Sequence, residues 1–259
     1  MPKLAANLTM LFTEYPPMER FQRAADAGFT GVEYLLPYGD PAEDVRARLD
    51  AANLFLVLMN LPAGDWAAGD RGIAAQPSRQ VEFRRGVEKA TEYARVLHPP
   101  KINCLAGRIG PEHDAMDILA QNVRHAASSL EILDIRLVVE PVNSFDVNGF
   151  ALPTTQAALD LIAAVDHPNL GLQFDVYHSL RMGEDPFAFI RDHGRDIAHI
   201  QIADVPGRHQ PGTGSIDFSA LFDTIDQSGY EGWVSLEYVP EGPTESGFEL
   251  LREMGYLGG

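Results

Sequence analysis

The sequence predicts a single-domain α/β protein, a closed (β/α)8 TIM barrel that covers residues 1–259. Strand-like and helix-like segments alternate along the whole chain, with no linker between them. There are eight such pairs, and parallel strands joined by helical crossovers close into a packed cylinder when they number eight. The length of 259 residues and the hydrophobic share of 45% suit one barrel of this kind.

The predicted strands are short apolar runs bounded by turn residues. They cover residues 3–10, 31–35, 54–61, 101–107, 136–143, 170–178, 197–204 and 232–238. Each run is followed by apolar residues at helical spacing, which predict helices over 17–28, 41–53, 78–97, 115–133, 154–165, 186–194, 219–229 and 244–255. Gly28 marks the end of the first helix, because glycine readily adopts the backbone conformation that terminates helices.

Within the fifth to eighth predicted strands, the apolar runs LVVE, GLQFD, AHIQ and VSLE each end in an oxygen-bearing side chain: Glu140, Asp175, Gln201 and Glu237. An ionised carboxylate at the end of a buried strand is costly unless a cation accompanies it. In a sequentially wound barrel these ends are neighbours at one mouth. Three carboxylates and an amide predict an all-oxygen site for a hard divalent metal, Mg²⁺ or Mn²⁺. The alternative is that each acid caps a loop or pairs with a surface lysine, and four in succession argue against it.

A divalent ion at this mouth could bind adjacent hydroxyl and carbonyl oxygens of a substrate and stabilise an enediolate. Glu140 and Glu237 could also carry protons to and from the substrate carbons. Aldose–ketose isomerisation, ketose epimerisation and hydrolysis by a metal-activated water all fit this arrangement. The residues therefore predict metal-assisted chemistry and leave the reaction open.

Two histidines lie close in sequence to these predicted strand ends. His178, three residues after Asp175, is placed to hydrogen-bond a substrate hydroxyl. His199 precedes Gln201 by two residues, so it faces the same way, one layer deeper in the barrel. We expect His199 to fill the core or to support the site from below.

Two long connections bring arginines toward the mouth. The Gly/Ala-rich segment 60–77 carries Arg71, and the segment 203–218 after the seventh strand carries Arg208. Long loops in compact domains are often lids or binding loops. Both arginines are candidates for binding a substrate carboxylate, whereas Lys101 begins the fourth strand and should lie at the opposite end of the barrel.

Composition excludes several classes of protein. The formal net charge of −17 disfavours nucleic acid as a partner, because nucleic-acid binding requires a basic surface. The sequence contains neither an apolar run of membrane-spanning length nor a leader, which predicts a cytoplasmic protein without membrane contact. The lone Cys104 lies in a strand-like run and is expected to be buried and inert. A homo-oligomer is compatible with the sequence, which does not determine the oligomeric state.

The chain resembles the hydroxypyruvate isomerase family of the xylose-isomerase-like barrel superfamily, which includes 2-oxo-tetronate isomerases and ketose 3-epimerases. The resemblance runs nearly end to end. It is carried by AANLTMLFTEYPPMERF, GVEYLLPY, NLPAGDWAAGDRGIA, KINCLAG, EPVNSFDVNGF, QFDVYH, HIQIADVPGRHQPGTGSIDF and GWVSLEY. The combination of NLPAGDWAAGDRG with KINCLAG resembles the hydroxypyruvate branch in particular.

The resemblance assigns roles to residues. It implies that Glu140 and Glu237 transfer protons, and that the superfamily's metal ligands fall on Glu140, Asp175, Gln201 and Glu237. Gln201 stands where many epimerases carry histidine, a difference that this branch shares. The implied reaction interconverts hydroxypyruvate and 2-hydroxy-3-oxopropanoate (tartronate semialdehyde). One glutamate would remove a proton from C3, the metal would hold the enediolate oxygens, and a carboxyl group would return a proton to C2.

Other functions remain open from the sequence. The same site could serve a 2-oxo-tetronate isomerase or a ketose 3-epimerase. A metal-dependent endonuclease for abasic DNA uses a related barrel, but it would need more histidine ligands and a basic face. A non-catalytic sugar-binding barrel would need no pair of glutamates.

Overall fold

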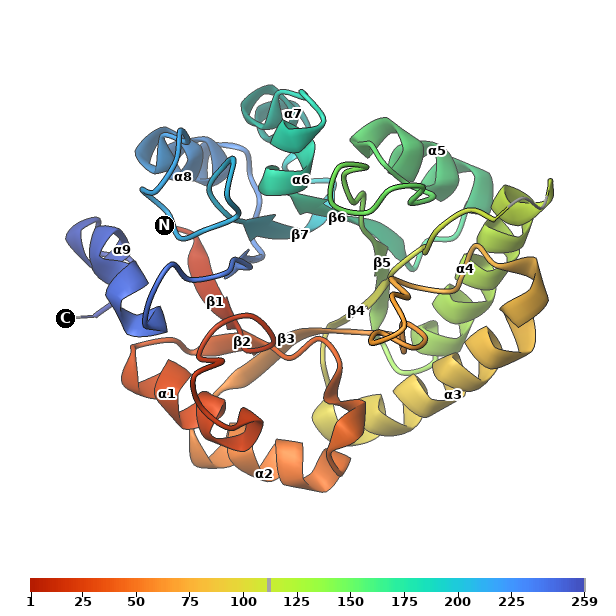
Figure 1. The fold of residues 1–259 in the computed structure, drawn as a ribbon, viewed down its shortest axis with the longest axis horizontal. Coiled ribbons are helices and arrows are strands. Elements are labelled where there is room, and N and C mark those ends of the chain that lie inside the picture. Colours follow the sequence, from red (N-terminus) through yellow and green to blue (C-terminus); the bar gives the residue numbers. More distant parts are fainter. Residues whose placement is uncertain (111–112, 259) are drawn as a thin grey trace.

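A computed structural model describes residues 1–110 and 113–258 of the chain. Eight parallel strands form a closed barrel in sequence order, from β1 to β8 and back to β1. The strands lie at the centre of the molecule and the helices surround them (Figure 1). Their bounds are β1 Lys3–Asn7, β2 Gly31–Glu33, β3 Phe55–Asn60, β4 Lys101–Cys104, β5 Arg136–Val139, β6 Leu170–Asp175, β7 Ile197–Ile202 and β8 Trp233–Leu236.

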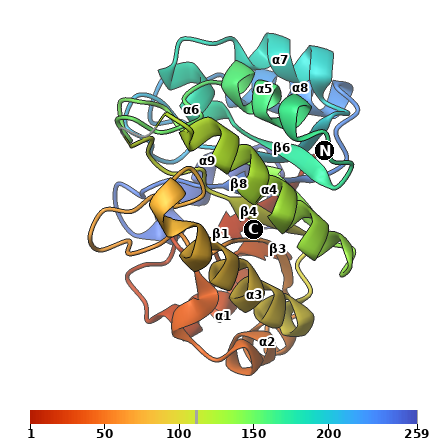
Figure 2. The ribbon, with the colours of Figure 1, turned by 90° about the vertical axis from the view of Figure 1, so that its right-hand side faces the viewer.

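The helices form the outer layer and follow the strands as predicted. They are α1 Arg20–Asp26, α2 Ala42–Ala51, α3 Gln80–Leu97, α4 Ala115–Glu131, α5 Thr155–Val165, α6 Val176–Arg181, α7 Pro186–His193, α8 Phe218–Gln227 and α9 Glu249–Glu253. Short 3-10 helices precede α1, α2, α3 and α9. Figure 2 shows α3 and α4 lying side by side on one flank of the barrel. The predicted (β/α)8 barrel is therefore confirmed.

Each strand ends earlier in the structure than the sequence predicts, and the hydrogen bonds at two of these ends show the reason. The sixth strand stops at Asp175, whose side chain accepts hydrogen bonds from the backbone N–H groups of Tyr177 (2.7 Å) and His178 (3.3 Å). Asp175 thereby caps α6, a short helix where the sequence pattern predicted further strand. The first strand stops at Asn7, whose Oδ1 accepts from the N–H of Thr9 and turns the chain.

The barrel interior is apolar at the end where the strands begin and polar at the end where they finish. Small and branched side chains of Ala5, Val57 and Val138 fill its middle. At the end where the strands begin, the Trp233 ring lies against Gly31 so closely that a Cβ there would approach it to 2.5 Å. Buried polar side chains gather at the other end, where the strands finish. The packing therefore leaves the carboxyl ends of the strands as the place for a site.

Two further expectations can be compared with the fold. Cys104 is buried, and burial raises the pKa of its thiol to about 12, so it is an unreactive core residue as expected. Within residues 1–110 and 113–258, none of the helices combines the length and the apolar character that crossing a bilayer requires.

Candidate active site

The four side chains predicted to converge lie at the carboxyl ends of neighbouring strands. Glu140 directly follows β5, Asp175 ends β6, Gln201 lies near the end of β7, and Glu237 directly follows β8. Asp175 and Gln201 are register partners across the β6–β7 pair. All four are at most 5% exposed. The predicted placement is confirmed, and their role as metal ligands stays a prediction.

The acidic side chains meet around one arginine and one histidine. Ligand-type atoms of Glu140, Asp175 and His178 all lie within 4.8 Å of one another. Arg208 donates from Nη2 to Oε2 of Glu237 at 2.7 Å, and the same nitrogen is 3.6 Å from Oδ2 of Asp175. The loop after β7 therefore brings Arg208 into the carboxylate cluster.

Burial dominates the electrostatics of this cluster. It raises the pKa of Glu140 to about 8, with the Asp175 carboxylate adding to the effect, and raises the pKa of Asp175 to about 6. The pKa of Glu237 lies well above its ordinary value for the same reason, although Arg208 opposes the shift. Burial also works against the charge of Arg208, but the surrounding carboxylates hold its pKa above the ordinary value. One guanidinium thus faces three buried acids.

The donor set fits a divalent cation. Oδ2 of Asp175 is buried and has no hydrogen-bond partner among the described residues. Oε2 of Glu140 accepts from Nδ2 of Asn103 at 2.8 Å, which fixes the carboxylate with Oε1 toward His178. Oxygen ligands with excess negative charge are what Mg²⁺ and Mn²⁺ prefer. Glu140, Asp175 and His178 could therefore hold a metal ion.

Gln201 takes part in a polar layer just below the cluster. Its Oε1 accepts from Nε2 of Gln173 at 2.6 Å, and its Nε2 donates to Oε2 of Glu33 at 2.9 Å. The amide oxygen that the sequence assigns to a metal is thus hydrogen-bonded to Gln173 in this structure.

Sequence reasoning missed Glu33, a fully buried carboxylate at the end of β2. It accepts hydrogen bonds from Nδ2 of Asn7 at 2.8 Å and from Gln201, and its Oε1 lies 2.5 Å from Nε2 of His199. The signal was present, because the run GVE ends in an acid just as the later strands do. His199 supports the site from the deeper layer, as expected.

His178 faces the acids from α6. Its Nε2 is 3.7 Å from Oδ2 of Asp175 and 3.9 Å from Oε1 of Glu140. Burial lowers the pKa of His178 well below its ordinary value, and the positive charges of Arg208 and Arg181 add to this. Burial and these charges therefore favour the neutral form of the imidazole.

The other predicted cations lie elsewhere. The Arg71 guanidinium lies 3.9 Å from the centre of the Trp66 ring and donates to the carbonyls of Trp66 and Asp70. These partners belong to its own loop, and Trp66 is 46% exposed. Lys101 begins β4 at the opposite end of the barrel from the carboxylates, as predicted. Of the two candidate arginines, only Arg208 makes contacts within the carboxylate cluster.

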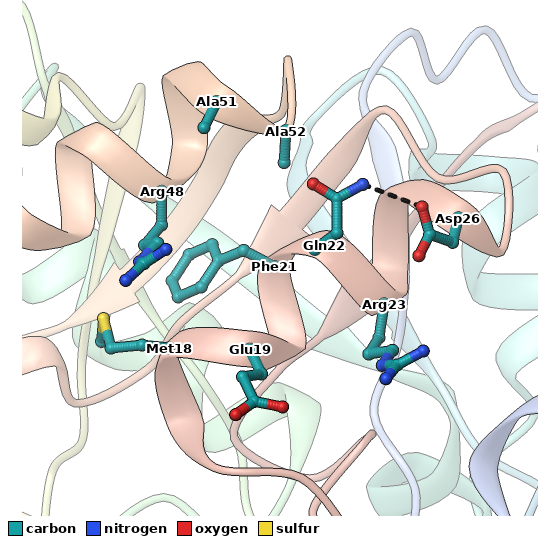
Figure 3. Close-up of a pocket in the computed structure, with 9 residues that line it drawn as sticks. All are labelled: Met18, Glu19, Phe21, Gln22, Arg23, Asp26, Arg48, Ala51 and Ala52. Carbon is teal, nitrogen blue, oxygen red and sulfur yellow. Dashed lines mark hydrogen bonds between the residues drawn. The ribbon is translucent and has the colours of Figure 1, made fainter.

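A surface cavity of about 390 Å³ lies between α1 and α2 (Figure 3). Phe21, Arg48 and Asp26 are among its lining residues, and Gln22 donates a hydrogen bond to Asp26 there. It shares no residue with the carboxylate cluster and lies on the outside of the barrel. This cavity is therefore separate from the barrel mouth.

Comparison with known proteins agrees with this fold. Residues 21–254 match the family model described as xylose isomerase-like TIM barrel. The chain is 46% identical to hydroxypyruvate isomerase of Escherichia coli (strain K12), covering 97% of this chain and 98% of that protein. It is 38% identical to 2-oxo-tetronate isomerase of Cupriavidus necator, with full coverage of both chains.

Solved structures of other proteins superpose on this chain over nearly its whole length. A crystal structure from Brucella melitensis, described as an AP endonuclease of family 2, superposes with a TM-score of 0.94 at 40% identity, covering 98% of this chain and 99% of that one. The Escherichia coli 3-keto-D-glucoside 4-epimerase superposes with a TM-score of 0.82 at 20% identity, covering 98% and 100%, and so shares the fold. The chain belongs to the xylose isomerase-like TIM barrel family and, within it, to the hydroxypyruvate isomerase family.

Proposed function

We propose that the protein is an isomerase that interconverts hydroxypyruvate and 2-hydroxy-3-oxopropanoate. The observation that carries the proposal is the pair of buried glutamates, Glu140 and Glu237, that meets Asp175 and Arg208 at the barrel mouth. The 46% identity to the hydroxypyruvate isomerase of Escherichia coli favours this three-carbon substrate. A cytoplasmic location and a small anionic 2-oxo acid as substrate belong to the same proposal.

The two glutamates are suited to moving protons between neighbouring carbons. Each is held through its Oε2 atom, Glu140 by Asn103 and Glu237 by Arg208. Oε1 of Glu140 is left without a hydrogen bond and can face a substrate, whereas Oε1 of Glu237 also accepts from Nδ2 of Asn7 at 3.3 Å. A general acid or base works best when its pKa lies near the operating pH, and burial raises the pKa of Glu140 to about 8. In this scheme one glutamate takes the proton from C3, a carboxyl group delivers a proton to C2, and the hydroxyl proton of O3 passes to O2 as the C3 carbonyl forms.

Glu140, Asp175, Gln201 and Glu237 are the residues that would hold a divalent ion, Mg²⁺ or Mn²⁺. When bound, such an ion supplies positive charge that polarises the substrate carbonyl and stabilises the enediolate. Arg208 is the candidate partner for the substrate carboxylate. A planar guanidinium binds a carboxylate through two parallel hydrogen bonds, and the acidity of the chain makes a local cation necessary. Arg71 is the second candidate, because its loop follows β3.

The alternative with the same chemistry is a 2-oxo-tetronate isomerase, which 38% identity to the enzyme of Cupriavidus necator supports. A coupled assay should compare hydroxypyruvate, a four-carbon 2-oxo acid and a neutral ketose at matched concentrations. We expect kcat/KM to be highest for hydroxypyruvate. A higher kcat/KM for the four-carbon acid would favour a 2-oxo-tetronate isomerase, and a higher kcat/KM for the ketose would favour a 3-epimerase.

The description of the Brucella structure suggests a nuclease as another class. The formal net charge of −17 opposes DNA binding. Across residues 1–110 and 113–258, the residues that could hold a metal form one group with a single histidine. Incubation with a duplex that contains an abasic site should therefore produce no cleavage, and metal-dependent cleavage would contradict the isomerase assignment.

A further inference from the structure

The loop that follows β5 contains a buried asparagine that contacts the site histidine. Asn143 is 0% exposed, and its Oδ1 accepts from the backbone N–H groups of Phe145 (3.0 Å) and Asp146 (2.9 Å). Two donors at Oδ1 fix the orientation of the amide, because the NH2 group in that place would face two other donors. The Nδ2 group must therefore point the opposite way.

The partners of Nδ2 confirm this orientation. Nδ2 lies 3.0 Å from Oδ2 of Asp146, a carboxylate oxygen that also accepts from the hydroxyl of Tyr177 at 3.0 Å. Its second contact is Nδ1 of His178, at 2.7 Å. The backbone N–H of Asn143 points at the same ring nitrogen from 3.5 Å. Asn143 thus presents donors to Nδ1 of His178 from both its side chain and its backbone.

A ring nitrogen that accepts a hydrogen bond carries a lone pair and no proton. The neutral imidazole must then carry its proton on Nε2. That nitrogen is the one that faces Glu140 and Asp175. A protonated Nε2 has no lone pair to offer a metal, but it can donate to an oxygen.

We propose that Asn143 is a positioning residue that fixes His178 as an Nε2–H donor toward the substrate and excludes it from the metal ligands. The inference rests on the proposed function for the identity of the substrate oxygen, which is the C2 oxygen that gains a proton during isomerisation. Although His178 lies in the group of residues close enough to share an ion, the ion is held by oxygen atoms, and the histidine hydrogen-bonds the substrate.

The first test is independent of activity. The wild-type protein is labelled with nitrogen-15 histidine and observed by NMR at pH 7.5. A long-range proton–nitrogen correlation spectrum reports which ring nitrogen carries the proton. The His178 signals are assigned by their loss in His178→Gln. We expect a protonated Nε2 and an unprotonated Nδ1, both before and after addition of Mg²⁺. A proton on Nδ1, or loss of the Nε2 proton on adding Mg²⁺, would overturn the proposal.

The second test changes the positioning residue. In Asn143→Asp the new carboxylate can still accept from the backbone N–H groups of residues 145 and 146. It would face the Asp146 carboxylate, so the variant is made together with Asp146→Asn, which removes the repulsion, and Asp146→Asn alone is a further control. The new carboxylate can then only accept from His178 and so draws the proton to Nδ1. We expect kcat for hydroxypyruvate to fall about 10–100-fold, with the Nδ1–H form in the spectrum. Asn148→Asp, the same change at an exposed position of the same loop, is the matched control and should retain wild-type kcat.

The outcomes separate this proposal from the proposed function. A folded Asn143→Asp protein with the Nδ1–H form and unchanged kcat would show that the tautomer does not matter for turnover, and would overturn the positioning role. A wild-type protein that turns over none of the tested 2-oxo acids would contradict the proposed function. The spectrum of His178 would still decide which nitrogen carries the proton.

Discussion

Gln201 on β7 donates a hydrogen bond to Glu33 on β2, 2.9 Å away across the barrel interior. The same carboxylate accepts from Asn7 and contacts His199, so one buried acid connects β1, β2 and β7 beneath the site. The side chains beneath the site therefore depend on Glu33, an acid to which the family resemblance assigns no role in proton transfer or metal binding.

Glu33→Gln should destabilise the protein. The new amide would turn an NH2 group toward at least one of the donors Asn7, Gln201 and His199, and a buried unsatisfied donor costs about 1–3 kcal/mol. For a domain of this size the melting temperature should fall by about 2–4 °C per kcal/mol. Glu131→Gln, the same change on an exposed position, is the control for thermal unfolding. An unchanged melting temperature for Glu33→Gln would mean that the contacts of Glu33 with Asn7, Gln201 and His199 do not stabilise the fold.

Glu140→Gln and Glu237→Gln should each abolish most turnover while the fold persists. General acid–base roles are worth about 10²–10⁴-fold, and the loss of a negative ligand adds to this. Steady-state kinetics with hydroxypyruvate measures the effect, and circular dichroism verifies the fold. A variant that keeps more than about a tenth of wild-type kcat would show that its glutamate is not a proton carrier.

Metal binding should be visible without any substrate. Three buried acids surround one guanidinium, so a divalent cation relieves repulsion in the folded state alone. Mg²⁺ or Mn²⁺ at about 100 times its dissociation constant should stabilise by about 2.7 kcal/mol, which corresponds to a rise of about 5–10 °C in melting temperature. The rise is measured against protein treated with a chelator.

Asp175→Asn tests where the metal ion binds. Oδ2 of Asp175 is the buried oxygen of the cluster that accepts no hydrogen bond, so this variant should lose most of the thermal shift, whereas Glu131→Gln should keep it. An equal shift in all three proteins would place the ion elsewhere.

Arg208→Ala should raise KM for hydroxypyruvate sharply, because a charged hydrogen bond is worth about 1.5–3 kcal/mol. Turnover of a neutral ketose should change much less. Arg71→Ala is the companion variant, and its guanidinium is bound to the carbonyls of Trp66 and Asp70 in its own loop. If both variants leave KM for the acid unchanged, or lower activity equally on acid and ketose, the carboxylate binds to another group.

Lys101→Met should stabilise the protein at pH 7. Burial, with the nearby charge of Arg136, lowers the pKa of Lys101 to about 8, against about 10.4 in an unfolded chain. At pH 7 the folded protein therefore bears the cost of a buried charge, and methionine removes it, for a gain of about 1–3 kcal/mol. Between pH 8 and 10.4 only the unfolded chain keeps the proton, so the stability of the wild type rises with pH.

The gain from Lys101→Met should accordingly shrink as the pH is raised toward 10. Denaturant unfolding at pH 7 and at pH 10 measures it. Lys3→Met, at the exposed first residue of β1, is the matched control and should show no such pH dependence. A gain that is constant across this range would mean that the charge of Lys101 is not the cause.

The sequence by itself predicted the fold, because eight short apolar runs that alternate with segments of helical period favour closure into one barrel. It also placed Glu140, Asp175, Gln201 and Glu237 at one mouth, since parallel strands in sequence order bring their carboxyl ends together. The end of the sixth strand could not be predicted from the local sequence pattern. A strand pattern runs through to His178, but the side chain of Asp175 caps a helix and turns His178 toward the acids.

Only the tertiary structure decided which partners these side chains meet. Glu33 lies 168 residues before Gln201 and 166 before His199, so local spacing could not show that they touch. The two arginines looked equivalent in sequence, yet the loop after β7 directs Arg208 into the cluster, while Arg71 stacks on Trp66. The proton on His178 likewise depends on the amide of Asn143, 35 residues away, because hydrogen-bond donors and acceptors are matched in space rather than along the chain.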